Sequence, residues 1–358
     1  TVKTRKNQVD LRVSSIPTPF GEKMVIRFLY PNRGAVEINE VGMLPDTVES
    51  LLALSNKPQG MIVVTGPTGS GKSSSLCAII NSIKSEDTNI ISVEDPIEYK
   101  ITGVNQIAVN EKQGVTFASA LRAILRQDPD VVYVGEIRDP ETAKIAVQAA
   151  QTGHMVFSTL HTNDASSAVT RLLNLDVEPH NIAASLTAVL AQRLSRRVCR
   201  ECAYPVSPNQ DELKALQVLG RETQLNLIRG QGCTKCFSSG YSGRIAITEL
   251  LIVDDTVRQY IIEKRSASDI NEAARKGGMR TMWETALLMV ASGVSTLEEV
   301  SRHVPRTFVD GAVNDTPQSI LIADDDPEIQ KLLEMALRPL QATVYIASDG
   351  EMALAMAM

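Results

Sequence analysis

Residues 66–73 read Gly-Pro-Thr-Gly-Ser-Gly-Lys-Ser, and this octapeptide limits the possible folds of the 358-residue chain more than any other feature. It fits the P-loop pattern, in which glycines let the backbone direct successive N–H groups at phosphate oxygens. The apolar run 61–64 precedes it and a helical stretch follows, so the loop joins a strand to the positive end of a helix. The pattern predicts a nucleoside triphosphate site.

Individual roles follow from this motif. Lys72 is expected to place its charge on the β and γ phosphates of ATP, and the Ser73 hydroxyl to ligate Mg²⁺. The residues assigned to nucleotide binding are Gly66, Pro67, Thr68, Gly69, Ser70, Gly71, Lys72, Ser73 and Ser74.

Around the P-loop, short β-rich runs alternate with helical stretches, which is typical of a parallel sheet with crossover helices. Strands are predicted at 61–65, 90–93, 131–135 and 155–159. Helices are predicted near 44–55, 72–84, 117–126, 141–152 and 180–197, and residues 245–304 are predicted to be helical with short loops. Upstream, residues 9–14 and 23–29 indicate a strand, a turn broken by Pro17 and Pro19, and a second strand.

Two acidic positions follow predicted strands. Glu136 ends the run Val131-Val-Tyr-Val-Gly-Glu, where a carboxylate can hold Mg²⁺ through water, although a carboxylate that only caps the strand would have the same sequence. Glu94-Asp-Pro-Ile-Glu98 can supply a general base for the attacking water. The sequence leaves open whether Glu94 or Glu98 does so, or whether the segment is a solvated loop.

Composition limits the partners and the location. A net charge of −6 and a pI near 5.4 argue against a surface that neutralises nucleic-acid phosphates. No stretch approaches the ~20 apolar residues of a membrane span and no signal peptide opens the chain, so a cytoplasmic location is expected. The chain lacks an initial methionine and stops within a helical pattern at Met358, which is typical of a fragment.

Four of the five cysteines form two Cys-x-x-Cys pairs. Thirty residues separate Cys202 from Cys233, and each pair can contribute two thiolates to one tetrahedral Zn²⁺. The predicted zinc ligands are Cys199, Cys202, Cys233 and Cys236. An unmetallated reduced cluster and a redox pair are the alternatives. Cys77 stands apart and is expected to be a core residue.

Four ordered segments resemble one family. The segments are Gly-Pro-Thr-Gly-Ser-Gly-Lys-Ser, Glu-Asp-Pro-Ile-Glu-Tyr, Leu-Arg-Gln-Asp-Pro-Asp-Val-Val-Tyr-Val-Gly-Glu-Ile-Arg-Asp and Thr-Gly-His-Met-Val-Phe-Ser-Thr-Leu-His-Thr-Asn. In this order they resemble the Walker A, Asp box, Walker B and His box of the bacterial type II secretion and type IV pilus assembly ATPases (GspE/PilB type). The resemblance covers about residues 5–305. It implies a RecA-like ATPase in a homo-hexameric ring, at the inner face of the cytoplasmic membrane. The implied partners are an inner-membrane platform protein and the cytoplasmic domain of a membrane anchor, without nucleic acid.

The resemblance also implies residue roles. Glu94 becomes the catalytic carboxylate of the Asp box and Glu136 that of Walker B, while His154 and His161 would sense the γ phosphate. Arginines from other subdomains or subunits would neutralise phosphate charge, although each of them alone is equally consistent with a surface salt bridge. They are Arg12, Arg27, Arg122, Arg126, Arg138 and Arg244, with Lys23 at a position where another arginine is expected. The tetracysteine element favours assembly or export over retraction, because the family's retraction motors lack it.

The segment from Ser319 onward resembles the first strand and helix of a two-component receiver domain, with Asp324 and Asp325 as its Mg²⁺-binding acidic pair. A generic βα unit is the alternative. The phosphoaccepting aspartate would lie beyond Met358.

The expected fold class is α/β, with a RecA-like P-loop core, a partial PAS-like N-terminal sheet, a zinc insert, a helical subdomain and a partial flavodoxin-like receiver. The predicted boundaries are 1–36, 37–198, 199–243, 244–305, a linker at 306–318, and 319–358. Two rival functions remain, namely a nucleic-acid-translocating P-loop ATPase and a receiver-controlled nucleotide switch.

Overall fold

The computed structural model describes residues 2–3, 8–29, 37–220, 223–306, 319–337 and 343–357. The chain divides into two compact units, Thr1–Thr307 and Phe308–Met358. Most of the predicted linker at 306–318 lies outside the described residues. None of the described helices is long and apolar enough to cross a bilayer.

A seven-stranded sheet forms the centre of the larger unit. Its strand order is β12-β9-β4-β8-β7-β5-β6, and every neighbouring pair is parallel except β12 with β9. The strands are β4 (Gly60–Thr65), β5 (Ile90–Glu94), β6 (Asn105–Ala108), β7 (Val131–Val134), β8 (Met155–Leu160), β9 (Leu186–Val198) and β12 (Tyr241–Ile252). The four predicted core strands and their parallel arrangement are confirmed.

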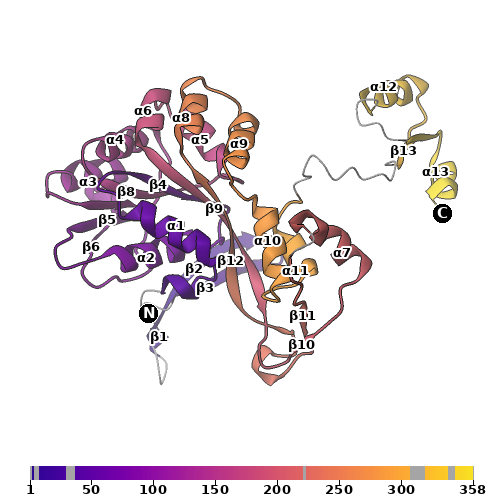
Figure 1. Cartoon of the computed structure of the whole chain (residues 1–358), viewed down its shortest axis with the longest axis horizontal. Helices are drawn as coiled ribbons and strands as arrows, with labels where there is room; N and C mark the ends of the chain where they lie inside the picture. Colours follow the sequence, from indigo (N-terminus) through magenta and orange to yellow (C-terminus); the bar gives the residue numbers. More distant parts are fainter. Residues whose placement is uncertain are drawn as a thin grey trace. The chain divides into compact units, whose positions relative to one another are not determined.

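Helices cover both faces of this sheet, because both faces carry apolar side chains. Along β4, Met61 and Val63 belong to one buried cluster while Ile62 and Val64 belong to the other. The helices α1 (Pro45–Ser55) and α2 (Lys72–Ile83) cover the second cluster. The first is covered by α3 (Phe117–Ile124), α4 (Pro140–Gln151), α5 (Ser166–Asn174) and α6 (Pro179–Ser185) (Figure 1).

The predicted helix over 180–197 is wrong. Helix α6 ends at Ser185, and the chain continues as the thirteen-residue strand β9. The run Leu-Thr-Ala-Val-Leu-Ala is apolar throughout, so its sequence has no alternation that separates a strand from a buried helix. Pairing with β4 on one side and β12 on the other satisfies the backbone of β9, and this long-range pairing decides its structure.

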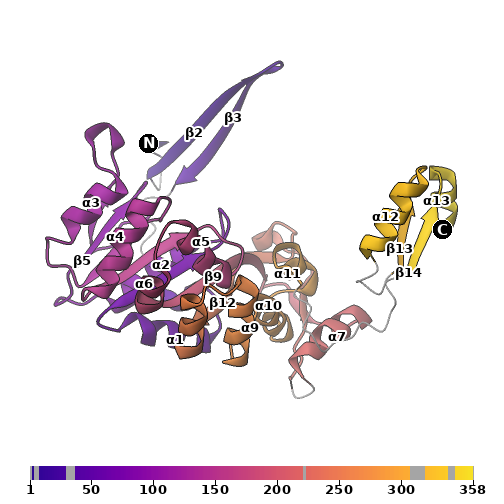
Figure 2. The same cartoon turned by 90° about the horizontal axis from the view of Figure 1, so that it is seen from above.

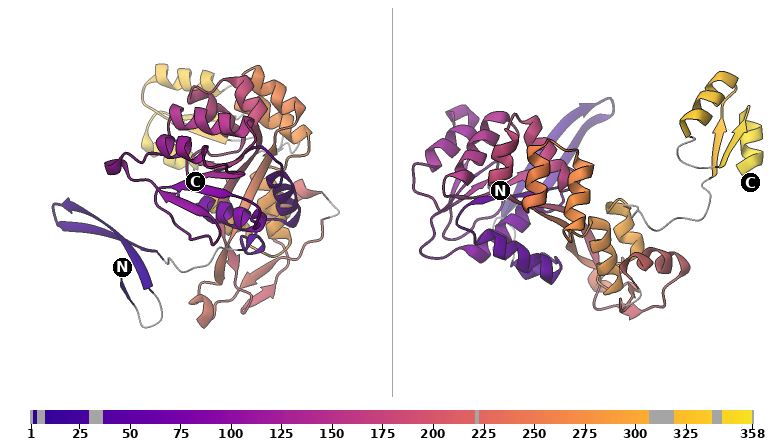
Figure 3. Two further views of the ribbon diagram at one scale, coloured as in Figure 1. Left: turned by 90° about the vertical axis from the view of Figure 1, so that its left-hand side faces the viewer. Right: turned by 45° about the horizontal axis from the view of Figure 1, so that its top comes forward.

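The prediction of helix over 245–304 is also wrong at its start, because β12 continues to Ile252 as the partner of β9. Four helices follow: α8 (Asp255–Ile262), α9 (Ala267–Lys276), α10 (Met282–Ala291) and α11 (Leu297–His303). Each begins at a side-chain N-cap, as at Asp254 and Ser266, which satisfies a free backbone N–H group. Helices α8 and α9 pack on α6 and α5 (Figure 3, right).

The cysteine region is built from short elements. Strands β10 (Ala203–Pro205) and β11 (Ile228–Gly230) pair antiparallel, and helix α7 (Gln210–Leu216) lies between them in the sequence. Short 3-10 helices occur at Ile38–Glu40, Glu111–Gln113, Gln217–Leu219 and Thr234–Cys236.

Near the N-terminus, β1 (Val2–Lys3), β2 (Gln8–Thr18) and β3 (Gly21–Leu29) form an antiparallel sheet, which confirms the predicted strand, turn and strand (Figure 2). Strand β2 does not stop at Pro17, which still pairs with Glu22.

The smaller unit contains parallel strands β13 (Ser319–Ala323) and β14 (Thr343–Ala347) with helices α12 (Pro327–Leu337) and α13 (Gly350–Ala357). This arrangement agrees with a βα unit, and its assignment to a receiver domain stays a prediction.

Candidate nucleotide site

A cavity of about 320 Å³ lies where the strands β4, β5, β7 and β8 end. Carboxyl ends of parallel strands are the usual binding edge of an α/β sheet. Its lining comes from the P-loop, the Asp box and the segments after β7 and β8: Thr68, Gly69, Ser70, Gly71, Lys72, Ser73, Ser74, Glu94, Asp95, Pro96, Glu98, Tyr133, Gly135, Glu136, Thr159, His161, Leu194 and Arg244.

The P-loop has the backbone that phosphate binding requires. Gly69 and Gly71 have φ values of 82° and 86°, and Gly71 is the N-cap of α2. Lys72 Nζ donates to the carbonyl oxygens of Gly66 (2.7 Å) and Pro67 (3.2 Å), and burial lowers the pKa of Lys72. The Ser70 hydroxyl is buried and has no hydrogen-bond partner among the described residues. A polar group left unpaired in a glycine-formed cradle fits a phosphate-bearing ligand.

Gln192 on β9 holds this loop in place, and the sequence analysis missed it. Its side chain is fully buried, with Nε2 donating to Ser70 O (2.7 Å) and Oε1 accepting from Ser75 Oγ (2.7 Å). A Cβ atom at Gly71 would lie 2.9 Å from Gln192 Nε2, and the φ of +86° is strained for any other residue, so both observations favour glycine there. Gln192 is 117 residues from Ser75, and no local pattern signals this contact.

Glu94 ends β5 and is 4% exposed. Its Oε1 atom accepts hydrogen bonds from Ser92 Oγ (2.7 Å) and Gln106 Nε2 (2.9 Å). Burial raises the pKa of Glu94, while these two donors lower it. A carboxylate with a raised pKa inside a cleft has the property of a general base. Glu98 lines the same cavity.

Glu136 lies beside Arg138 and His161. Arg138 Nη2 is 2.5 Å from Glu136 Oε1, and this contact raises the pKa of Arg138. His161 Nε2 is 3.7 Å from Glu136 Oε2. Burial, and then the positive charge of Lys72, lower the pKa of His161 below its usual value. The lowered pKa favours the neutral imidazole of His161, which can still donate to or accept from a phosphate oxygen.

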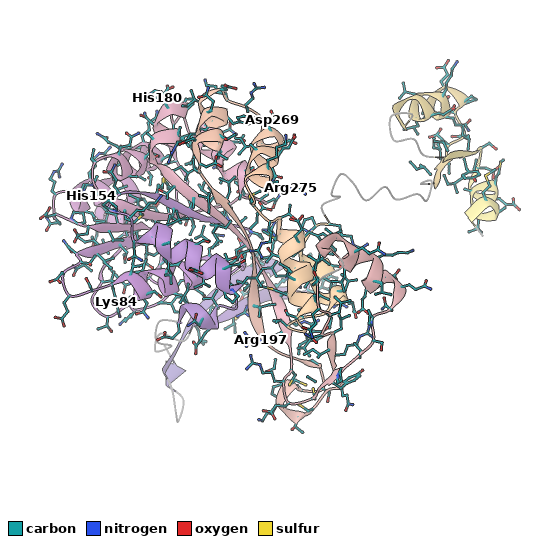
Figure 4. All side chains as sticks on the ribbon, in the orientation of Figure 1. Lys84, His154, His180, Arg197, Asp269 and Arg275 are labelled. Atoms are coloured by element: carbon teal, nitrogen blue, oxygen red, sulfur yellow. The ribbon has the colours of Figure 1, made fainter. Side chains whose placement is uncertain are left out.

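His154 does not belong to this site, contrary to the role implied by the resemblance. It precedes β8 whereas His161 follows it, and a strand of this length separates them by roughly 20 Å. Its Nδ1 atom is 3.0 Å from Ala149 O. The position of His154 in the larger unit is labelled in Figure 4. His154 therefore anchors the end of α4 at the opposite edge of the sheet.

The predicted arginines fall into three groups. Arg138 contacts Glu136, and Arg244 lines the cavity. Arg122 forms an ion pair with Glu141, and the exposed Arg126 lies further along the same segment, so neither lines this chain's own cavity. Arg12 and Arg27 are paired across β2 and β3, and their side chains lie outside the described residues.

The four predicted cysteine ligands converge. All four Sγ atoms lie within 4.8 Å of one another, with Cys199–Cys233 and Cys202–Cys236 separations of 3.9 Å. The pairing of β9 with β12 and of β10 with β11 brings the two Cys-x-x-Cys pairs together. A tetrahedral Zn²⁺ with Zn–S bonds of ~2.3 Å needs sulfur atoms about 3.8 Å apart. The arrangement therefore fits one zinc ion.

A P-loop between a central parallel strand and a helix, with acidic residues at the ends of β5 and β7, defines an α/β protein of the P-loop nucleotide-binding class. A family model described as Type II/IV secretion system protein matches residues 1–302. The chain belongs to this type II/IV secretion system protein family.

Relatives and a solved structure agree with the family. The type IV pilus assembly ATPase PilB of Thermus thermophilus is 50% identical over 293 residues, which are 82% of this chain and 33% of that protein. The type II secretion system protein HxcR of Pseudomonas aeruginosa is 47% identical over 294 residues, or 82% of this chain and 59% of that protein. The chain thus spans less than two thirds of either relative.

The crystal structure of the pilus retraction motor PilT with bound ADP is similar to this one, with a TM-score of 0.60 and 31% identity. The similarity covers 83% of this chain and 74% of that one. It confirms the RecA-like ATPase fold of the core.

Proposed function

We propose that this chain is the ATP-hydrolysing part of a hexameric motor that powers type IV pilus assembly or type II secretion. The observation that carries the proposal is the shared cavity of the P-loop, Glu94 and Glu136 in a chain of this family. Its relatives are named as pilus assembly and type II secretion proteins, and the PilT structure holds ADP.

In this mechanism ATP lies with its phosphates on the P-loop N–H groups. Lys72 exchanges the carbonyl oxygens of Gly66 and Pro67 for the β and γ phosphates. Ser73 and, through water, Glu136 would hold Mg²⁺, which neutralises charge that develops on the phosphates. Glu94 accepts a proton from the attacking water, and His161 contacts the γ phosphate as a neutral imidazole.

Arginines complete the charge balance. Arg138, which contacts Glu136, and Arg244, which lines the cavity, would act on the phosphates of this chain's own site. Arg122 and Arg126 are not among the residues that line that site, and we assign them to the nucleotide of a neighbouring subunit. Arg12 and Arg27 act from the N-terminal sheet. Guanidinium groups supplied in this way stabilise the transition state for γ-phosphate transfer.

The cysteine element is a structural Zn²⁺ site in this proposal, with thiolate ligands from Cys199, Cys202, Cys233 and Cys236. The expected subdomain boundaries are kept in this proposal except that of the helical subdomain, which begins after Ile252 because β12 belongs to the central sheet. Asp324 and Asp325 would be the Mg²⁺-binding acidic pair of a receiver domain.

The motor would act at the inner face of the cytoplasmic membrane, on a platform protein and a membrane anchor. The net charge of −6 disfavours nucleic acid as its track. The four-cysteine element and the relatives named as assembly and secretion proteins support extension or export.

This choice of partner is testable with the full-length protein. We expect its steady-state ATPase rate to rise several-fold when the cytoplasmic domain of the platform protein is added, and not when duplex or single-stranded DNA is added at low salt. A protein of equal charge but unrelated fold is the control. Salt-dependent stimulation by DNA alone would replace the proposed motor with a nucleic-acid translocase.

A further inference from the structure

We propose that Gln106, on the edge strand β6, is a positioning residue for ATP hydrolysis that orients Glu94 and locks the Asp-box segment 95–101 against it. The proposal rests on the proposed function, because it takes Glu94 as the base. It concerns a residue that lies outside every motif of the sequence analysis.

The Gln106 amide uses both of its ends. Nε2 donates to Glu94 Oε1 (2.9 Å) and to Tyr99 O (2.9 Å), and Oε1 accepts from Ile101 N (2.9 Å). One side chain therefore joins the end of β5 to two points of the segment that follows it. A side chain with three directed hydrogen bonds has one allowed orientation, so it can transmit that orientation to its partners.

The network continues to the P-loop helix. The Tyr99 hydroxyl is 2.9 Å from Ser74 Oγ, in the first turn of α2. Ser74 follows the predicted Mg²⁺ ligand Ser73 directly in the chain. Tyr99 therefore links the nucleotide-binding helix to Gln106 and Glu94, with its hydroxyl bonded to Ser74 and its backbone carbonyl bonded to Gln106.

Because of these contacts, the two carboxylate oxygens of Glu94 have different hydrogen-bond partners. Oε1 accepts from both Ser92 and Gln106. Oε2 accepts no hydrogen bond from the described residues, and Glu94 lines the cavity. With Oε1 held, Oε2 is the atom that faces a water molecule, in the geometry that proton abstraction requires. No comparable set of contacts holds Glu98 among the described residues, which favours Glu94 over Glu98 as the base.

The surroundings of Glu94 act on its pKa in opposite directions. Burial and the negative charge of Glu98 both raise its pKa, whereas the Gln106 and Ser92 donors lower it. The other titratable or charged groups that face it are Asp95 in its own loop, Lys72 and Cys77 on α2, Tyr133 and Glu136 at β7, and His161 after β8. Gln106 thus lowers the pKa of the buried carboxylate and favours its ionised form.

The test is a kcat against pH profile of the full-length hexamer with Gln106→Met and Gln106→Asn. Both variants remove the amide donor from Glu94. Methionine has no N–H group, and the asparagine side chain is one methylene group shorter.

A general base works in its deprotonated form, and the loss of a hydrogen-bond donor raises the pKa of Glu94. The acid limb should therefore move upward by about one pH unit, because a hydrogen bond to a charged group is worth about one pKa unit. We expect kcat to fall about tenfold or more, with the KM for ATP unchanged, because the Glu94 oxygen is misplaced.

Asn105→Met is the matched control, since Asn105 is the exposed neighbour on the same strand and should leave the profile unchanged. A wild-type acid limb in either folded Gln106 variant, or an effect confined to KM, would overturn the proposal. Glu94→Gln in the same assay distinguishes failure of the role of Gln106 from failure of the proposed catalytic site. If it destroys turnover while the Gln106 variants behave as wild type, only the role of Gln106 fails, whereas retained turnover in Glu94→Gln refutes the proposed site itself.

Discussion

Glu94→Gln is expected to reduce the kcat of ATP hydrolysis by about 10²–10⁴-fold, because it removes the proton acceptor for the attacking water. The amide fills nearly the same volume and keeps an oxygen for the Ser92 and Gln106 donors, so the fold and ATP binding should survive. Steady-state turnover and titration with a fluorescent ATP analogue measure the two effects separately.

Glu98→Gln is the matched control for this experiment, because Glu98 lines the same cavity. Removing its negative charge should lower the pKa of Glu94 and leave kcat at neutral pH within a few-fold of the wild type. A large loss in Glu98→Gln together with a small one in Glu94→Gln would reverse the assignment. Lys72→Ala, in contrast, should weaken ATP binding as well as turnover, because it removes the charge that contacts the phosphates.

The second large effect is expected on the folding of the cysteine region when zinc is removed. Structural Zn²⁺ contributes on the order of 10 kcal/mol to the folding of small cysteine sites, more than a two-stranded element can supply by itself. We expect one zinc per chain, and a strong chelator or Cys233→Ser should unfold residues 199–240. Metal analysis and limited proteolysis, with cleavage mapped by mass spectrometry, check both statements.

The part of the chain around the seven-stranded sheet provides two controls for the zinc experiment. Cys77 is buried on α2, apart from the cluster, so Cys77→Ala should keep the full zinc content. The nucleotide cavity should also retain its ligand after chelation, because none of its lining residues lies between 199 and 240. A zinc-free preparation with an intact protease pattern would show that the cysteines are an unmetallated cluster.

Local patterns were enough for a large part of this molecule. The P-loop, the strands ending at Thr65 and Glu94, and the strand before Glu136 were predictable because a motif and a short apolar run lie within about ten residues of each other. The convergence of the two cysteine pairs was predictable for a similar reason, since thiolate spacing within each pair already fits one metal ion.

Two wrong predictions, for strand β9 and for His154, have a different cause in common. Strand β9 has no period that excludes a helix, and it is a strand only because β4 and β12 bond to both of its edges. His154 and His161 look alike in the sequence, but β8 places them at opposite edges of the sheet. Neither error involves a misread residue, since each depends on what lies beside the segment in space.

The sequence by itself determined the P-loop on a parallel sheet and a four-cysteine element that fits one metal ion, because both features depend on residues that are close together in the chain. Only the tertiary structure decided how the site is held. Gln192 reaches the P-loop from β9 and Gln106 reaches Glu94 from β6, through hydrogen bonds that span up to 122 residues of chain. Such contacts depend on the order of the strands in the sheet, and no local pattern encodes that order.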